Sequence, residues 1–147
     1  MSWSISVGGR VAFPSDKAVR EWLDSEFRED AHDDWDDMFG LDGKGRWRCK
    51  DYLGNTDWDD DVYIHCALEG KVLRLRAELP EDFANENLRA VAAFVRSAAP
   101  FGAEGILEAC VPGEDAECLT LADGDSQVGP SETESWEVFE QEHFDDL

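Results

Sequence analysis

Residues 61–80 decide the fold of this chain, and they read DVYIHCALEGKVLRLRAELP. Apolar residues alternate with polar ones through both halves of the stretch, at Val62, Ile64, Cys66, Leu68, Leu73, Leu75, Ala77 and Leu79. A period of two is typical of strands that are buried on one face. Gly70 and Lys71 separate the halves, and two residues are enough for a tight turn. The stretch therefore predicts a β-hairpin with its apolar face inward and Arg74 and Arg76 outward.

Further strands are expected on both sides of this hairpin. Strict alternation predicts a half-buried strand over residues 2–7, which can resume through Phe13. A second hairpin is predicted from residues 105–111 and 117–121, and a short strand from residues 46–52. Together these segments predict a sheet of about five to six strands.

Two main helices are predicted from apolar residues at helical spacing. The first covers about residues 16–29, with Ser15 as its N-cap, and the second runs from near Asn85 to Pro100. The resulting order of strand, helix, hairpin, helix and hairpin is typical of the α+β class. We expect an antiparallel sheet with both helices packed on one face.

The length of the chain predicts one globular domain over residues 1–147. Within it, residues 30–61 are expected to form an acidic, loop-rich insertion, and residues 123–134 a polar linker. A short C-terminal helix is one expectation for the last residues, because four side chains lie at helical spacing: Trp136, Phe139, His143 and Phe144. Trp136 and Val138 would equally suit a short edge strand.

Charge is the most unevenly distributed property of the sequence. The chain has 35 Asp and Glu against 13 Lys and Arg, a formal net charge of −22 at pH 7. Repulsion at this level destabilises a compact state, so solubility alone does not account for it. Fourteen acids lie between Asp24 and Asp61, and twelve lie from Glu114 to Leu147, where no Lys or Arg occurs. This clustering indicates a negative surface that meets a positively charged partner.

Two clusters place carboxylates on both sides of a tryptophan, and we take them as the candidate partner-binding residues. The first consists of Asp33, Asp34, Trp35, Asp36 and Asp37, and the second consists of Asp57, Trp58, Asp59, Asp60 and Asp61. An exposed indole supplies contact area, while the acids attract Lys and Arg of the partner. The alternative is that the two rings cap the core from loops and the acids are merely solvated.

No metal ion or cofactor is expected. Asp57, Asp59 and Asp61 resemble the opening of a calcium loop, but two later positions do not fit. Val62 stands where an EF-hand needs Gly, and Leu68 stands where it needs Glu. The His and Cys residues show no zinc-ligand spacing.

The sequence also predicts a protein that is not an enzyme. Motifs for a nucleophile elbow, a phosphate-binding loop or a dinucleotide-binding turn are absent from it. Direct nucleic-acid binding is disfavoured because phosphate contact requires a positive local field. The small basic group of Arg46, Arg48 and Lys50 is expected to pair with neighbouring acids instead.

The sequence predicts a cytoplasmic protein that does not associate with membranes. Its first residues show no secretory pattern, and no stretch has the roughly 18 apolar residues that a membrane helix needs. In that compartment the four cysteines should be mostly reduced. Cys110 and Cys118 could face each other across a hairpin, so a bridge between them stays open, as does the oligomeric state. Cys49 and Cys66 are expected to be core-facing strand residues.

The chain resembles the small acidic immunity proteins that bacteria make against their own toxins, in its size, charge and order of elements. It is also similar in character to inhibitors that mimic nucleic acid. The resemblance implies a protein that binds a basic toxin domain, of the kind that acts on nucleic acid, and occludes its cleft. No motif transfers a residue role, so the two clusters above remain the candidate site.

Two other functions fit the composition. An acidic adaptor or regulatory protein from a high-salt habitat would carry acids over its whole surface and few lysines, and this chain has four Lys. An enzyme with a motif-poor site is a weaker alternative, since it would need perturbed acids in an apolar pocket.

Overall fold

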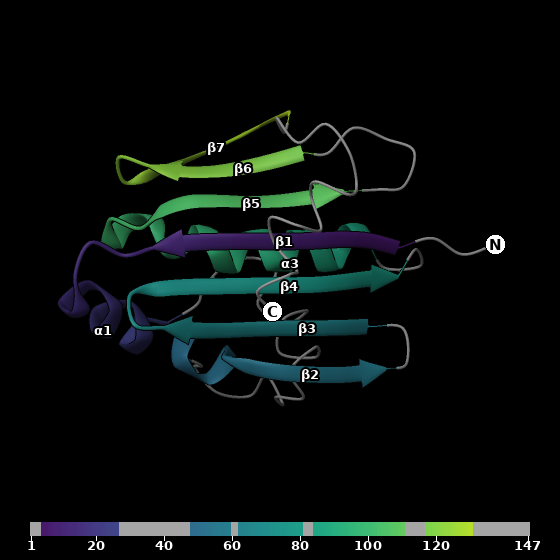
Figure 1. Ribbon diagram of the computed structural model, residues 1–147, viewed down its shortest axis with the longest axis horizontal. Coiled ribbons are helices and arrows are strands. Elements are labelled where there is room, and N and C mark those ends of the chain that lie inside the picture. Colours follow the sequence, from purple (N-terminus) through teal and green to yellow (C-terminus); the bar gives the residue numbers. More distant parts are fainter. Residues whose placement is uncertain (1–3, 27–47, 60–61, 81–83, 111–116, 131–147) are drawn as a thin grey trace.

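The computed structural model describes residues 4–26, 48–59, 62–80, 84–110 and 117–130, and the structural statements below concern these residues. Seven strands form one sheet in the order β2-β3-β4-β1-β5-β6-β7 (Figure 1). The strands are β1 Ser4–Ala12, β2 Gly54–Asp59, β3 Val62–Glu69, β4 Val72–Pro80, β5 Glu104–Cys110, β6 Glu117–Ala122 and β7 Asp125–Pro130. The helices are α1 Asp16–Asp24 and α3 Ala84–Arg96, with two 3-10 helices, η1 Cys49–Tyr52 and η3 Ala99–Phe101. The predicted α+β class and antiparallel sheet are confirmed, with seven strands in place of five to six.

The N-terminal strand β1 lies at the centre of the sheet. It pairs along its whole length with β4, from Ser4 opposite Pro80 to Ala12 opposite Val72, and on its other side with β5. The hairpin predicted from residues 61–80 is confirmed as β3 and β4, and the second hairpin is confirmed as β5 and β6. The two predicted hairpins therefore flank a strand from the beginning of the chain.

Alternation gives the sheet two chemically different faces. In β4 the side chains of Leu73, Leu75, Ala77 and Leu79 are all buried, and the residues between them are half-buried. Helix α3 lies behind β1 and β4 in Figure 1, and α1 lies at the end of the sheet where β1 finishes. We call the face covered by α3 the helix face. The opposite face, to which Ser6, Arg76 and Glu108 belong by register, is called the polar face.

Aromatic rings join the helices within the core. The ring centroid of Trp22 in α1 lies 5.2 Å from that of Phe13 and 5.5 Å from that of Phe94 in α3. Tyr52 of η1 meets Phe94 edge-on at 5.9 Å. All four rings are buried, and such pairs contribute roughly 0.5–1.5 kcal/mol each beyond the burial of their area. The aromatic cluster therefore fixes α1, α3 and η1 to one another.

Helix α1 begins where the sequence predicts and ends earlier. The Oγ of Ser15 accepts a hydrogen bond from the Ala18 amide at 3.1 Å, which confirms Ser15 as the N-cap. The helix stops at Asp24, although helical spacing predicts it to residue 29. Ser25 has extended backbone angles, and its amide donates to the Trp22 carbonyl at 3.0 Å, which closes the last turn.

Two other segments differ from the sequence-based expectation. The strand expected over residues 46–52 is replaced by η1, and the strand follows it as β2. β7 lies within residues 123–134, which the sequence predicts to be a polar linker. Only Val128 in β7 has a large apolar side chain, so alternation could not reveal this strand. The residues of the expected C-terminal helix lie outside the described part of the chain.

Gly105 of β5 marks the closest approach of two strands. Its φ is +154°, and a Cβ built there would lie 2.1 Å from the carbonyl oxygen of Arg10 in β1. We expect Gly105→Ala to lower the free energy of unfolding by about 2–4 kcal/mol, because the backbone on both sides is held in the sheet. Urea denaturation followed by tryptophan fluorescence measures this change.

The matched control is Gly129→Ala in the edge strand β7. A Cβ at Gly129 would meet no atom within 4 Å, so this variant should stay within about 0.5 kcal/mol of the wild type. Equal destabilisation by the two substitutions would contradict the close-approach argument.

Candidate functional site

The two predicted clusters differ in how far the structure describes them. Most of their residues lie outside the described part of the chain: Asp33, Asp34, Trp35, Asp36, Asp37, Asp60 and Asp61. Asp57, Trp58 and Asp59 belong to the end of β2, where the backbone but not the side chains is described. The described residues that adjoin the two clusters in sequence therefore define the surroundings of the candidate site.

The stretch that contains the first cluster is tied off by a short stem, formed by Ser25, Glu26, Arg48 and Cys49. Glu26 and Arg48 form an isolated antiparallel bridge, and the Cys49 amide donates to the Ser25 carbonyl at 2.9 Å. Outside the stem, Asp24 Oδ1 lies 3.6 Å from the Arg48 guanidinium and 3.7 Å from Lys50 Nζ. These ion pairs are exposed, so each contributes little. The backbone closure holds Glu26 and Arg48, the residues on either side of residues 27–47, next to each other.

A partly buried set of polar side chains anchors this stem to the core. The Oγ of Ser25 donates to the Trp22 carbonyl at 2.6 Å and lies 3.5 Å from the Cys49 sulfur. The Trp22 indole Nε1 donates to Ser97 Oγ at 3.0 Å, and the Ser97 hydroxyl donates in turn to the Phe94 carbonyl. Pairing buried polar groups avoids a cost of about 1–3 kcal/mol for each unsatisfied group. The stem and the C-terminal end of α3 are therefore joined through Trp22.

The second cluster occupies the other end of β2. Asp59 pairs with Val62 of β3, and the register between β2 and β3 shifts between Thr56 and Asp59. The stem leads through η1 into the start of β2, an edge strand of the sheet (Figure 1). Six residues of strand span roughly 20 Å. The stem and the backbone of Asp57, Trp58 and Asp59 therefore lie toward opposite ends of one edge strand.

Net negative charge is concentrated outside the described side chains. These include 12 of the 35 acids and 10 of the 13 Lys and Arg. With Asp57 and Asp59 of β2 and Glu86 of α3, the described ranges hold 15 acids and 10 bases, a formal charge of −5, and the other residues hold 20 acids and 3 bases, a formal charge of −17. The sheet and its helices therefore carry little of the net charge, and most of the acidity belongs to the segments that connect and follow the described elements.

All four cysteines are free, and three of them are buried. Burial raises the pKa of the Cys49 thiol, and burial raises the pKa of the Cys66 thiol strongly. Cys66 faces the core from β3 as predicted, whereas Cys49 lies in η1 and not in a strand. Burial and then the nearby Glu108 raise the pKa of the Cys110 thiol. These thiols stay protonated at neutral pH, which makes them poor nucleophiles and poor metal ligands.

Cys110 and Cys118 do not lie directly opposite each other. The register of β5 and β6 pairs Cys118 with Glu108, so Cys110 stands two residues farther along. Among the described residues, no group of three or more His, Cys, Asp or Glu is arranged to hold a metal ion. No helix in the described ranges has the length and apolar content that crossing a membrane requires.

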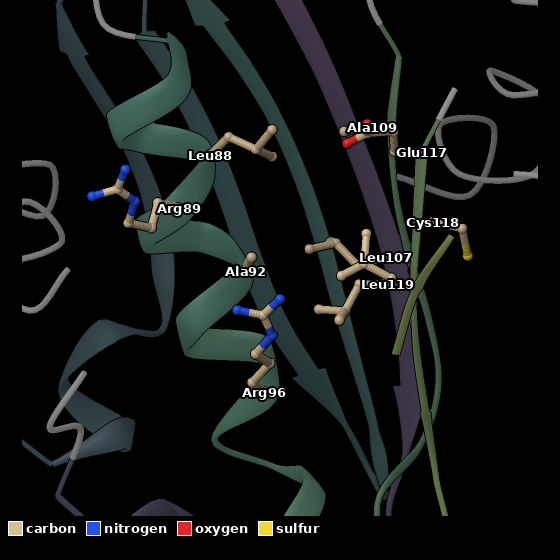
Figure 2. Close-up of a pocket in the computed structure, with 10 residues that line it drawn as sticks. Leu88, Arg89, Ala92, Arg96, Leu107, Ala109, Glu117, Cys118 and Leu119 are labelled. Carbon is tan, nitrogen blue, oxygen red and sulfur yellow. The ribbon is translucent and has the colours of Figure 1, made fainter. Parts of the chain in front are cut away.

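A groove between α3 and the strands β5 to β7 was not expected from the sequence (Figure 2). It has a volume of about 260 Å³ and a largely apolar floor, to which Leu107 and Leu119 contribute. Val128 at its edge is 59% exposed, an unusual exposure for a large apolar side chain. Arg89 and Arg96 of α3 flank the groove and make no ion pair with any described carboxylate. In the sequence, the two arginines are seven residues apart, and this spacing places them on one side of a helix. It was the one signal from which a basic flank could have been predicted.

Comparisons with protein-family models, with curated proteins and with solved structures found no match to this chain.

Substitution of Ser97 tests the hydrogen bonds that join the stem to the core through Trp22. We expect Ser97→Ala to lower the free energy of unfolding by about 1–3 kcal/mol, because the buried indole Nε1 of Trp22 loses its acceptor. Chemical denaturation followed by circular dichroism measures the change. Ser126→Ala in β7 is the control, and it should be nearly neutral. A Ser97→Ala variant as stable as this control would show that the indole finds another acceptor.

Proposed function

We propose that this protein binds and occludes the basic surface of a toxin domain in the cytoplasm, as an immunity protein does. The observation that carries the proposal is the separation of charge between a sheet that carries little of the net charge and strongly acidic connecting segments. Acids that served only solubility would have no reason to avoid the folded body. Acids that form a docking surface are expected to gather in a few segments.

The attachment of the clusters supports this proposal. The first stretch is held at its base by the stem at Ser25 and Cys49, and the second lies at the end of β2. Fixed attachment reduces the conformational entropy that is lost when a binding segment is ordered by its partner. A stem that carries one acidic stretch, about one strand length from the second cluster, suits a partner with a broad positive cleft, such as the substrate groove of a nucleic-acid-cleaving toxin.

The mechanism follows from electrostatics and shape. Negative potential over the β2 edge attracts the cationic partner at long range and accelerates the encounter. In the complex, Trp35 or Trp58 acts as the apolar anchor while the surrounding aspartates pair with Lys and Arg. The partner's cleft is then blocked sterically, and its positive groups are no longer available for phosphate contacts. Association slows as salt rises, because mobile ions screen the charges.

The charge of the described side chains also weighs against the high-salt alternative. An acidic coating that reflects habitat would cover the sheet and helices as well as the connecting segments. Instead, the described side chains contain almost as many Lys and Arg as Asp and Glu. The distribution thus favours a localised docking surface over a general adaptation of the whole surface.

The proposal predicts that a gene beside that of this chain encodes a basic, toxic domain, and it is tested by co-expressing the two products. We expect the wild-type chain to restore growth and to form a stable complex with that domain. Removing four charges with Asp33→Asn, Asp34→Asn, Asp36→Asn and Asp37→Asn should slow association by about tenfold or more at low salt. Surface plasmon resonance measures the rate constants. Replacing the four aspartates of the second cluster with asparagine tests whether that cluster also speeds association.

A charge-matched control separates the effect of losing charge at the clusters from the effect of lowering the total charge. The variant with Glu104→Gln, Glu117→Gln, Asp123→Asn and Asp125→Asn also loses four charges, at exposed positions of the described body. It should associate within about twofold of the wild type, because these acids belong to the β5–β7 side of the sheet, away from β2. The absence of a toxic neighbouring product, failure to restore growth, or equal effects of the two variants would contradict the proposal. Normal binding by both cluster variants combined with loss of binding by Val128→Glu would move the interface to the groove.

A further inference from the structure

The strands β5, β6 and β7 continue the helix face beyond the part that α3 covers. Helix α3 lies behind β1 and β4 in Figure 1, and the other three strands follow β1 toward the edge of the sheet. Three strand spacings extend over roughly 14 Å, which is wider than the roughly 8–10 Å between packed helix axes. A strip of the sheet beside α3 is therefore left over, and the groove described above lies along it.

A row of apolar side chains from three strands forms the floor of this groove. Leu107 of β5 pairs with Leu119 of β6, which in turn pairs with Val128 of β7. Leu107 and Leu119 are buried, whereas Val128 is largely exposed. The row thus runs from the core to an apolar side chain that water still contacts. An apolar group that covered Val128 would be stabilised by removing this surface from water.

One side of α3 forms the wall of the groove. Leu88, Ala92 and Arg96 are four residues apart, so they share one side of the helix (Figure 2). Leu88 and Ala92 are half-buried and extend the apolar lining, whereas Arg96 is exposed. Eight residues of helix rise roughly 12 Å. The wall is therefore apolar along about two helical turns and positively charged where it ends.

The two ends of the groove carry opposite charges. Glu117 pairs with Ala109 and lies toward the end that contains Leu88, whereas Arg96 lies toward the end that contains Leu119 (Figure 2). A ligand with one negative group would be attracted at Arg96 and repelled at Glu117. The groove thus favours one orientation, with the negative group at Arg96 and the apolar part toward Leu88.

The charge of Arg96 is not neutralised within the described part of the chain. Its guanidinium forms no ion pair with a described carboxylate. A basic residue in the last turn of α3 suits the helix dipole, but the dipole does not require an apolar groove beside it. A guanidinium offers paired donors that match the two oxygens of a carboxylate. The side chain is therefore suited to hold the head of an amphipathic anion.

We propose that the groove between α3 and β5–β7 binds a medium-chain carboxylate, with its head at Arg96 and its alkyl chain over Leu107, Leu119 and Val128. The volume of about 260 Å³ suits a short chain, since sites for drug-sized ligands measure roughly 300–1,000 Å³. A stable protein interface uses about 20–30 residues on each side, whereas ten residues line this groove. A small ligand is thus favoured over a second protein chain.

This inference does not rest on the proposed function. The groove adjoins β7, whereas the second acidic cluster begins in β2, at the other edge of the sheet. A ligand in the groove and a partner at the β2 edge would therefore occupy separate parts of the molecule.

Titration calorimetry of the full chain with sodium octanoate tests the site. At about 0.15 M salt we expect one molecule to bind per chain, with a dissociation constant below about 1 mM. 1-Octanol has the same chain without the charge, so it should bind at least about fivefold more weakly. A preference for the anion would be informative, because a formal charge of −22 disfavours anions except beside a local cation.

Matched variants separate the two parts of the ligand. Arg96→Gln should weaken octanoate binding by about fivefold or more and change 1-octanol binding by less than about twofold, because only the charge is lost. Arg20→Gln removes an exposed arginine of α1 and should leave both affinities within about twofold of the wild type. Val128→Thr keeps the shape of the side chain but adds a hydroxyl, so it should weaken both ligands by about threefold.

Amide NMR spectra of the wild type locate the ligand without any substitution. Octanoate should shift the amides of residues 88–96, 107–109, 117–119 and 128, and leave those of residues 48–59 in place. Absence of saturable binding, equal affinity for octanoate and 1-octanol, or equal effects of the two arginine variants would overturn the proposal. A wild-type dimer that Val128→Glu converts to a monomer in sedimentation would also overturn it, because a second copy would then occupy the groove.

Discussion

Electrostatic self-repulsion is the constraint to which the rest of this structure is adapted. A chain with a formal charge of −22 loses stability if its carboxylates crowd onto a compact body. The described elements limit this cost because they hold a small share of the net charge. Ion pairs such as Arg74 with Glu69, at 3.5 Å, keep charge balanced locally on the sheet. Most of the excess charge belongs to residues that connect and follow the described elements in sequence.

The core can then be formed by ordinary packing of apolar and aromatic side chains. The rings of Trp22, Phe94 and Tyr52 pack against one another, and the Trp22 indole Nε1 donates to Ser97 Oγ. This packing also fixes the base of the acidic stretch, because Ser25 and Cys49 belong to the same network. Stability and placement of the candidate site thus depend on the same few contacts. The acids themselves need contribute nothing to the fold.

The sequence predicts the strands and helices in which buried residues recur with the period of that secondary structure. Alternation identifies β3 and β4, and helical spacing together with the Ser15 cap identifies α1. The prediction fails where burial is partial or polar. β7 has a single large apolar residue, Val128, and pairs with β6 in an antiparallel register. Cys49 looks like a strand residue, yet it lies in a 3-10 turn because the stem requires a bend before β2.

For the candidate site, composition gives the charge and position of the clusters along the chain, but not their place on the fold. That place depends on pairings between distant residues, such as Ser25 with Cys49, which no local pattern encodes. The groove depends in the same way on α3 meeting β5 to β7, and each of these elements taken alone resembles an ordinary amphipathic segment. The place of these segments in the tertiary structure therefore cannot be predicted from local patterns in one sequence.

The central position of β1 has a consequence for synthesis on the ribosome. β1 emerges first, but its partners β4 and β5 begin only at Val72 and Glu104. Until then, both edges of an apolar strand lack hydrogen-bonding neighbours, and the intervening hairpin is free to form before it. Such late closure of distant pairs slows folding and exposes strands to wrong partners. The nascent chain should depend on chaperones until β5 has been translated, and its strong negative charge should help to keep unfinished copies apart.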